Sequence, residues 1–219
     1  MCGRKYASEE LTWAEYREIL DITQAPPDTN LQPNYNIAPT HKVPVCIEQD
    51  GERSLELLQW GLLPHWAKDK KVGYKMINAR SETLEEKASF KPLLESHRCI
   101  VPVSGFYEWK RDGKGKQAHK IEHADGRPML LAGLWTENSS LGVKTYTVVT
   151  TGATATFEAI HNRMPAILVK DQIGNWLAGE WKQAAELLSP FGGSLSIVPV
   201  SNDVGNVKNN YPELLQSLN

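Results

Sequence analysis

The chain has 219 residues, 41% hydrophobic and 23% charged, with a formal net charge of −2. These ordinary globular values argue against disorder, and the near-neutral charge excludes a global electrostatic attraction to nucleic acid, so any such site must be a local patch. No apolar run is long enough to span a bilayer or to form a signal peptide. Three scattered cysteines suggest neither a disulfide framework nor zinc, so we expect a reduced, cytoplasmic protein without metal or cofactor.

The first local signal is a helix start. Thr12 and Glu15 are three residues apart, the spacing of a capping box that satisfies free amides at a helix N-terminus. A helix over residues 13–22 is therefore predicted. The pair at 26–27 is Pro-Pro, which ends any continuation because proline lacks an amide hydrogen. Residues 34–40 are predicted to be irregular chain.

Strand-like patterns dominate the rest of the chain. Asp-Gly pairs at 50–51, 112–113 and 125–126 supply the positive φ angles of tight hairpin turns. The predicted strands are 43–49, 55–63, 98–103, 106–110, 118–123, 129–135, 146–151, 166–169 and 195–200. The predicted helices are 84–96, 154–160, 170–177 and 181–188.

These elements define the expected fold class. Many strands joined by hairpin turns, with few long helices, favour an α+β fold that is mainly antiparallel, a barrel-like sheet system with peripheral helices. No internal repeat or long linker divides the sequence, so a single domain over 1–219 is expected, with a monomer as the default for this size.

Cys2 is the first candidate for chemistry. Removal of the initiator methionine would leave a free α-amine, with a pKa of ~7.7–8.0, beside a thiol with a pKa of ~8.5. Such a 1,2-aminothiol captures aldehydes, because the amine forms a Schiff base and the thiolate closes a thiazolidine ring. The alternative is that residue 2 has no chemical role, and a retained Met1 would block the reaction.

Glu108 lies in an aromatic stretch that is predicted to be a strand. Two-residue alternation places it on the opposite face from Tyr107 and Trp109. A carboxylate beside aromatic rings is desolvated, which suits a general acid or base. A cross-strand ion pair is the structural alternative.

Other candidates are a histidine, an asparagine, two arginines and a tryptophan. His161 can shuttle protons near neutral pH, and Arg163 is a natural phosphate ligand. Asn78 can orient a reacting group, and Arg80 can bind a phosphate. Trp66, beside a lysine-rich loop, is a candidate stacking platform for a base. Each has a structural alternative: a structural histidine, a solvated loop or a core tryptophan.

Taken together, these segments resemble the SOS response-associated peptidase (SRAP) family over nearly the whole chain. The resemblance implies recognition of abasic sites in single-stranded DNA and at single-strand/double-strand junctions. It also implies a reversible thiazolidine crosslink that protects the lesion during the DNA damage response. The segments that carry the resemblance are Met1-Cys2-Gly3-Arg4, 35–40, 60–66, 78–83, 98–109, 134–135, 160–165 and 200–202.

The resemblance also implies a role for each matching residue. Cys2 would be the crosslinking nucleophile, and Asn78 would hold the N-terminal residue and the sugar. Glu108 would act as general acid/base, and His161 would assist proton transfer, including in reversal. The positions implied to lie along the DNA are Arg4, Arg80 and Arg163 at phosphates and Trp66 and Trp109 near the DNA path.

Two alternatives from other classes stay open at the level of sequence. The family name reflects an autoproteolytic peptidase, and Cys2, His161 and Asn78 form a Cys-His-Asn set for such a hydrolase, with lyase-like activity also implied. A peptidase needs only the thiol of Cys2, whereas thiazolidine formation needs the α-amine as well. The third interpretation is a non-covalent single-strand binder, which would bind intact and abasic strands equally.

Overall fold

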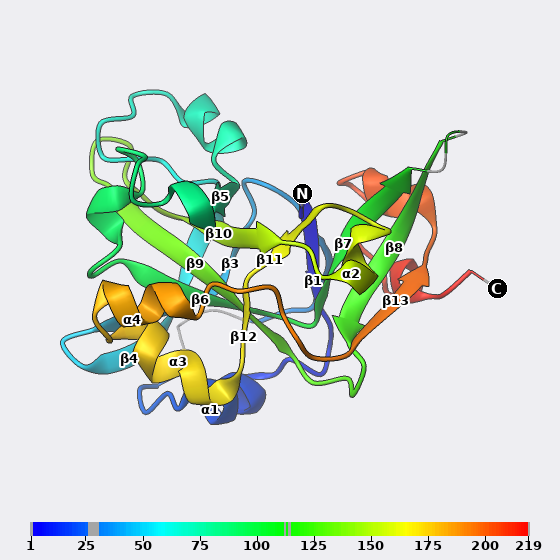
Figure 1. Ribbon diagram of the computed structural model, residues 1–219, viewed down its shortest axis with the longest axis horizontal. Helices are drawn as coiled ribbons and strands as arrows, with labels where there is room; N and C mark the ends of the chain where they lie inside the picture. Colours follow the sequence, from blue (N-terminus) through cyan, green and yellow to red (C-terminus); the bar gives the residue numbers. More distant parts are fainter. Residues whose placement is uncertain (1, 26–30, 112, 114, 219) are drawn as a thin grey trace.

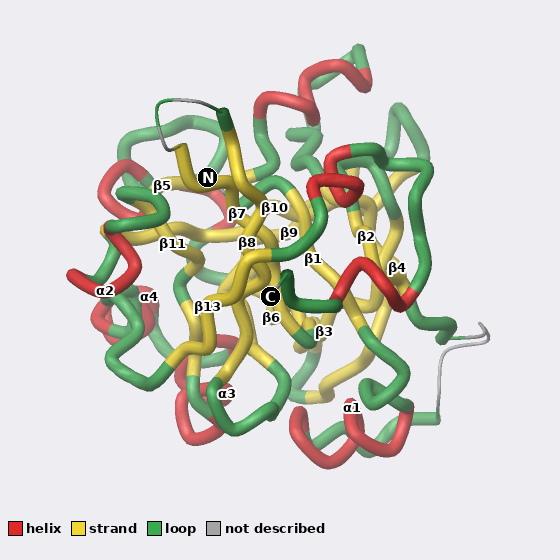
Figure 2. Tube along the Cα trace, turned by 90° about the vertical axis from the view of Figure 1, so that its right-hand side faces the viewer, coloured by secondary structure: helices red, strands yellow, loops and turns green. Residues whose placement is uncertain are grey.

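Strands form the body of the protein, as Figure 1 shows, and the computed structural model describes residues 2–25, 31–111, 113 and 115–218. Figure 2 shows the strands gathered at the centre and the helices around them. The strands are β1 (Arg4–Ala7), β2 (Asn34–Ile37), β3 (Lys42–Gln49), β4 (Glu52–Trp60), β5 (Asn78–Arg80), β6 (Arg98–Val103), β7 (Gly105–Arg111), β8 (Lys116–His123), β9 (Met129–Asn138), β10 (Val143–Gly152), β11 (Arg163–Pro165), β12 (Ile167–Leu168) and β13 (Leu195–Pro199).

These strands form two sheets among the described residues. The smaller sheet has the order β13-β8-β7-β1-β2, and the larger has the order β11-β10-β4-β3-β6-β9-β12, with β5 beside β10. Most pairings are antiparallel, whereas β10 pairs in parallel with β4 and β5. Because β10 also pairs with β9, the larger sheet bends back on itself. The expected antiparallel, barrel-like α+β fold is confirmed, but the sheets do not close into a true barrel.

The helices are short and peripheral, as expected. The α-helices are α1 (Trp13–Leu20), α2 (Ala155–Glu158), α3 (Ile173–Leu177) and α4 (Trp181–Glu186). The 3-10 helices are η1 (Lys70–Lys75), η2 (Ser81–Thr83), η3 (Lys91–Leu93), η4 (Lys170–Gln172), η5 (Asn202–Gly205) and η6 (Pro212–Leu215). No helix among the described residues is long and apolar enough to cross a membrane.

Two local predictions can be compared directly with the structure. The Thr12 side chain accepts a hydrogen bond from the backbone N–H of Glu15, as an N-cap does. The helix ends at Leu20 and not at residue 22, because Asp21 adopts a left-handed φ of 52°. Asp50 and Gly51 both have positive φ and join β3 to β4 in the predicted hairpin.

Other local predictions are wrong. Residues 34–37 form β2 rather than irregular chain, because they pair with β1. Residues 84–96 do not form a regular helix: turns and η3 carry Leu84, Leu93 and Leu94 into the core. Pro92, which lacks an amide hydrogen, lies inside this segment. Residues 26–27 and Asp112 of the predicted 112–113 turn lie outside the described residues.

Candidate active site

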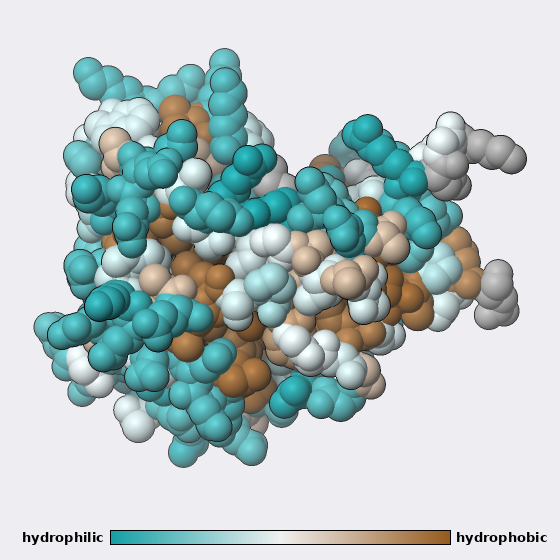
Figure 3. Space-filling model, viewed as in Figure 1, coloured by the Kyte–Doolittle hydropathy of each residue, from teal (hydrophilic) through white to brown (hydrophobic). Residues whose placement is uncertain are grey.

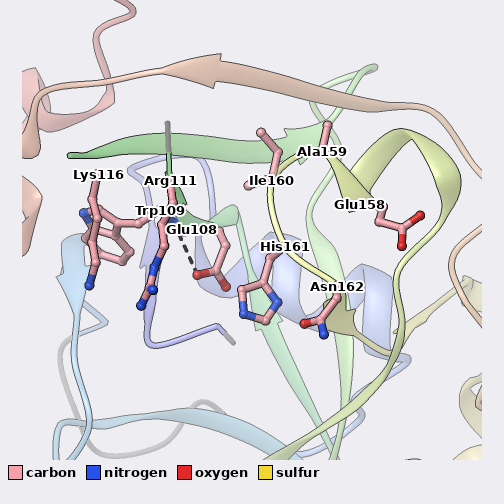
Figure 4. Close-up of a pocket in the computed structure, with 9 residues that line it drawn as sticks. All are labelled: Glu108, Trp109, Arg111, Lys116, Glu158, Ala159, Ile160, His161 and Asn162. Atoms are coloured by element: carbon pink, nitrogen blue, oxygen red, sulfur yellow. Dashed lines mark hydrogen bonds between the residues drawn. The ribbon is translucent and has the colours of Figure 1, made fainter. Parts of the chain in front are cut away.

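A polar pocket of about 600 Å³ opens beside the end of β7, where β7, β8 and the chain after α2 meet (Figure 4). Strand β7 contributes Glu108 and Trp109, and the segment between α2 and β11 contributes His161. These positions are far apart in the sequence and meet because both segments border the same opening. The complete lining is Glu108, Trp109, Arg111, Lys116, Glu158, Ala159, Ile160, His161 and Asn162.

Glu108 is almost completely buried, with 5% of its surface exposed. Its Oε1 accepts a hydrogen bond from the backbone N–H of Trp109 at 3.3 Å. Figure 4 shows its carboxylate and the ring of His161 side by side in the pocket. A carboxylate next to an imidazole, both facing one opening, is a suitable arrangement for proton transfer to or from a bound molecule.

The ring of His161 is held by its own loop. Its Nδ1 lies 2.9 Å from the backbone nitrogen of Arg163 and accepts that N–H. In the neutral ring the proton therefore resides on Nε2. This bond fixes the orientation of the imidazole, which points into the pocket in Figure 4.

Cys2 lies two residues before the start of β1, whose pairing with β7 sets its position. Arg4 is opposite Tyr107 in this antiparallel pair, so the chain before Arg4 runs along β7 toward Glu108. Cys2 is buried, and its Sγ lies 3.6 Å from the carbonyl oxygen of Arg4. Burial raises the pKa of the Cys2 thiol to about 12, Lys5 opposes this rise, and Glu108 adds to it. The resting sulfur is therefore a neutral thiol.

Asn78 holds Cys2 from the other side. It begins β5, which lies in parallel beside β10 with Asn78 opposite Val148. Its Nδ2 donates a hydrogen bond of 2.9 Å to the carbonyl oxygen of Cys2. The preceding residue, Ile77, is also fixed, because its carbonyl accepts from Trp60 Nε1 at 2.8 Å. Asn78 thus anchors the start of the chain on a rigid strand.

The three candidate arginines have different surroundings. Arg163 donates to both carboxylate oxygens of Glu82 and to the carbonyl of Thr150. Arg4 is partly buried and donates to the carbonyl of Gly3 at 2.9 Å. Arg80 is exposed at the end of β5, two residues beyond Asn78. Arg80 is therefore the most accessible of the three, and Arg163 is already paired with a carboxylate.

The two candidate tryptophans also differ. Trp109 is partly buried and lines the pocket, whereas Trp66 is 53% exposed on the loop between β4 and η1. Trp66 is not among the pocket-lining residues. Figure 3 shows a hollow in the surface between the lobe of residues 61–75 and the β7–β8 hairpin.

Sequence reasoning missed one residue close to Cys2. Lys5 lies on β1 and is completely buried, with its Nζ 3.1 Å above the centre of the Trp60 ring. A lysine between Arg4 and Tyr6 carries no sequence signal for burial, since lysine is almost never fully buried.

Among the described residues, no group of three or more His, Cys, Asp or Glu side chains could hold a metal ion.

Comparison with known proteins gives consistent results. The family model described as SOS response associated peptidase (SRAP) matches residues 1–207. The chain is 39% identical to "Abasic site processing protein YoqW" of Bacillus subtilis over 99% of this chain and 100% of that protein. It is 35% identical to "Abasic site processing protein YedK" of Escherichia coli over 99% of both chains. A solved protein from Bacteroides thetaiotaomicron matches with a TM-score of 0.75 and 27% identity, over 84% of this chain and 85% of that one.

Proposed function

This chain belongs to the SOS response associated peptidase family, and from that membership we propose that it processes abasic sites in DNA through a covalent bond to Cys2. The relatives named above, which match nearly their full length, are called abasic site processing proteins. The observation that carries the covalent step is the hydrogen bond from Asn78 to the carbonyl of Cys2. The bond holds Cys2 by its carbonyl oxygen and does not involve the amine or the thiol, the two groups that form the thiazolidine.

The reaction begins at the α-amine of Cys2 once Met1, which lies outside the described residues, is removed. The amine attacks C1′ of the ring-opened sugar, and the resulting carbinolamine loses water to give an iminium. Glu108 donates the proton that lets the hydroxyl leave, and His161 exchanges protons with solvent through Nε2. The thiol of Cys2 then adds to the same carbon and closes the five-membered ring.

The DNA strand lies along the hollow beside the pocket in this proposal. The exposed Arg80 meets a backbone phosphate, and Arg4 and Arg163 are the first residues of β1 and β11. Contacts of this kind add affinity without reading sequence, and with few of them the initial binding is modest and salt-sensitive. Trp66 and Trp109 offer ring faces to the bases next to the lesion. We propose single strands and strand junctions as the substrate because stacked duplex bases do not reach these rings.

The arrangement at Cys2 favours amine chemistry over a thiol peptidase. In a Cys-His-Asn peptidase the asparagine orients the imidazole, which in turn takes the thiol proton. Here Asn78 donates to the Cys2 carbonyl, and His161 Nδ1 accepts from the backbone of Arg163. Inserting one residue between Met1 and Cys2 separates the two functions, because it removes the terminal aminothiol and keeps the thiol.

The decisive experiment is intact-mass analysis before and after incubation with an abasic single-stranded oligonucleotide. We expect the mass of the chain without Met1, and then an adduct that survives denaturation. We expect Cys2→Ala to abolish the adduct. Cys46→Ala, which removes a buried thiol on β3, should preserve it. An abasic strand reduced with borohydride has no aldehyde and should give no adduct with the wild type. An adduct of full yield with Cys2→Ala would refute the proposal.

A further inference from the structure

The lobe of residues 61–75 carries a group of lysines that has no part in the chemistry described above. All four are exposed, and none forms an ion pair with a described residue: Lys68, Lys70, Lys71 and Lys75. Asp69 is the one acidic residue of the lobe, and its side chain accepts the backbone N–H of Lys71 at 2.8 Å to cap η1. In a chain with a formal net charge of −2, this lobe is a local cationic patch.

Two aromatic side chains lie exposed among these lysines. Tyr74 is 61% exposed and Trp66 is 53% exposed, which makes them the most exposed of the large hydrophobic side chains that the structure describes. A single exposed hydrophobic residue is ordinary, but two rings on one cationic lobe indicate a surface that binds a partner. Trp66 already has a proposed place beside the DNA, whereas Tyr74 has no role so far.

Hydrogen bonds at the base of the lobe fix it to the larger sheet. The buried side chain of Asn138, the last residue of β9, donates to the backbone carbonyls of Pro64 and Ala67 at 2.8 and 2.9 Å. The backbone N–H of Leu63 donates to Oγ1 of Thr145 on β10 at 2.9 Å. The exposed side chains therefore stand on a rigid support, which lowers the entropy cost of binding a partner.

The two ends of the lobe meet at a pair of glycines. A Cβ atom on Gly73 would lie 2.8 Å from the carbonyl oxygen of Gly61, so a larger residue cannot take this place without a shift of the backbone. Next to this contact, the backbone N–H of Leu62 donates to the carbonyl of Met76 at 3.1 Å. The lobe is thus closed at its base, unlike the solvated loop that the lysines alone suggest.

The lobe leads directly into the strand that anchors Cys2. η1 ends at Lys75, and β5 begins at Asn78, which holds Cys2, and ends at the exposed Arg80. Figure 1 shows the lobe projecting above β5, and Figure 3 shows the hollow between the lobe and the β7–β8 hairpin. A DNA strand that lies in this hollow with its lesion at Cys2 has the lobe along one side.

We propose that the lobe of residues 61–75 is a second DNA-binding element, in which the ring of Tyr74 stacks on an unpaired base and the lysines bind phosphates of undamaged nucleotides near the lesion. This inference rests on the proposed function for the lesion itself. It adds the class of ligand that the lobe binds, which is intact single-stranded DNA.

The chemistry of the lobe favours a single strand over other partners. Lysine ammonium groups bind phosphates as point charges, without reading the sequence. A tyrosine ring can stack on any unpaired base, because every base has a π-face. In a duplex the neighbouring base pairs cover these faces, so a combination of exposed ring and lysines fits a single strand best.

The role of Tyr74 is tested with an undamaged, fluorescein-labelled single strand, whose binding needs no reaction at Cys2. Tyr74→Leu should lower the affinity, measured by fluorescence anisotropy, at least about fivefold. Tyr74→Phe keeps the ring and should bind as the wild type does. Tyr211→Leu, at an exposed tyrosine outside the lobe, is the control and should also bind as the wild type does. Equal affinities of Tyr74→Leu and the wild type would exclude the stacking.

The role of the lysines is tested by the salt dependence of the same binding. The variant replaces the three lysines of η1 by glutamine: Lys70, Lys71 and Lys75. Its affinity should be at least about tenfold lower, and the slope of log affinity against log salt should fall by about two, because each phosphate contact to a single strand contributes about 0.7. An unchanged slope would show that these lysines do not bind phosphates.

Three exposed lysines outside the lobe provide a control with the same change in net charge: Lys87, Lys91 and Lys182. Their replacement by glutamine should leave the affinity and the slope near the wild-type values. All the replaced side chains are exposed, so each variant should unfold at the wild-type temperature. An equal loss in the control would mean that net charge acts alone, and the inference would be wrong.

Two further probes separate a single strand from other partners. Tyr74→Leu should bind a blunt duplex of the same sequence as the wild type does, and a loss equal to that for the single strand would contradict the assignment to unpaired DNA. Poly-L-glutamate should not bind the wild type. Saturable binding of this polymer that Tyr74→Leu abolishes would indicate an acidic protein as the partner instead.

The abasic-strand assay separates this inference from the proposed function. If Tyr74→Leu loses affinity for the undamaged strand but the wild type forms no adduct with an abasic strand, the proposed function is wrong and the role of the lobe stands. If the wild type forms the adduct but Tyr74→Leu and the lysine variant bind the undamaged strand as tightly as the wild type, the role of the lobe is wrong and the proposed function stands.

Discussion

The side-chain amide of Asn78 donates a hydrogen bond of 2.9 Å to the backbone carbonyl of Cys2, across 76 positions of the sequence. This bond connects the start of the chain to β5 and, through β5, to the long central strand β10. The position of the amine and thiol of Cys2 relative to Glu108 thus depends on a strand of only three residues.

Replacing Asn78 should therefore slow the chemistry more than it affects the fold. Asn78→Ala removes a hydrogen bond worth about 1 kcal/mol, which corresponds to roughly a fivefold lower rate of adduct formation. Single-turnover kinetics with an abasic oligonucleotide measure this rate. Asn209→Ala serves as a control, because it removes a hydrogen bond that a different asparagine side chain donates, to the backbone carbonyl of Asp203. Equal rates for Asn78→Ala and the wild type would exclude the anchoring role.

Glu108 should affect the rate of the reaction and leave DNA binding unchanged. Glu108→Gln keeps the shape of the side chain and removes its ability to give and take a proton, so adduct formation slows by about 10²–10⁴-fold. Fluorescence anisotropy at equilibrium, with a reduced abasic strand, should give the same affinity for both proteins. A variant that reacts at the wild-type rate would remove Glu108 from the acid/base role.

Glu82 should compete with DNA for Arg163. Both guanidinium nitrogens of the terminal fork of Arg163 donate to the carboxylate of Glu82, which occupies the face that a phosphate would bind. Glu82→Gln weakens this pairing and should tighten the binding of single-stranded DNA several-fold, whereas Arg163→Gln should weaken binding and lower its salt dependence.

Arg127→Gln is the control for this pair of variants. Arg127 is exposed, pairs with Asp125 and does not line the active-site pocket. Its loss should leave the affinity and the salt slope unchanged. If Glu82→Gln binds DNA more weakly than the wild type, Arg163 is a structural residue that Glu82 holds in place.

Lys5 should make the stability of the protein depend on pH with a defined sign. Its pKa is about 7 in the folded state, below the ordinary lysine value of 10.5, so the unfolded chain binds the extra proton between these two values. The free energy of unfolding then rises with pH across this window, by up to about 1.4 kcal/mol per unit, and the destabilisation is complete below about pH 7.

Urea denaturation at pH 7, 8 and 9 measures this dependence. The difference between the wild type and Lys5→Met isolates the lysine, because the buried tyrosines and cysteines, whose raised pKa values give the opposite slope at high pH, are common to both proteins. Lys5→Met should be the more stable protein at pH 7, and the difference should shrink toward pH 9. A constant difference would mean that Lys5 titrates normally.

Some of this architecture could be predicted from short stretches of sequence. Thr12 caps α1 and Asp50-Gly51 turns the β3–β4 hairpin, because each depends on the backbone preferences of a few consecutive residues. The candidates Cys2, Glu108 and His161 could be named for the chemistry of their side chains. These inferences required no knowledge of which distant segments meet.

Tertiary structure decided the rest. β1, β5 and β11 have three or four residues each, too few for a recognisable pattern, and they exist as strands because a neighbour pairs with them. The bond from Asn78 to Cys2 and the pairing of Arg163 with Glu82 join residues more than 75 positions apart. Lys5 is buried because β1, in the smaller sheet, directs it against Trp60, which ends β4 of the larger sheet. The type of side chain limits the chemistry that a residue can perform. Long-range packing determines which groups surround it, and those groups shift its pKa and provide its hydrogen-bond partners.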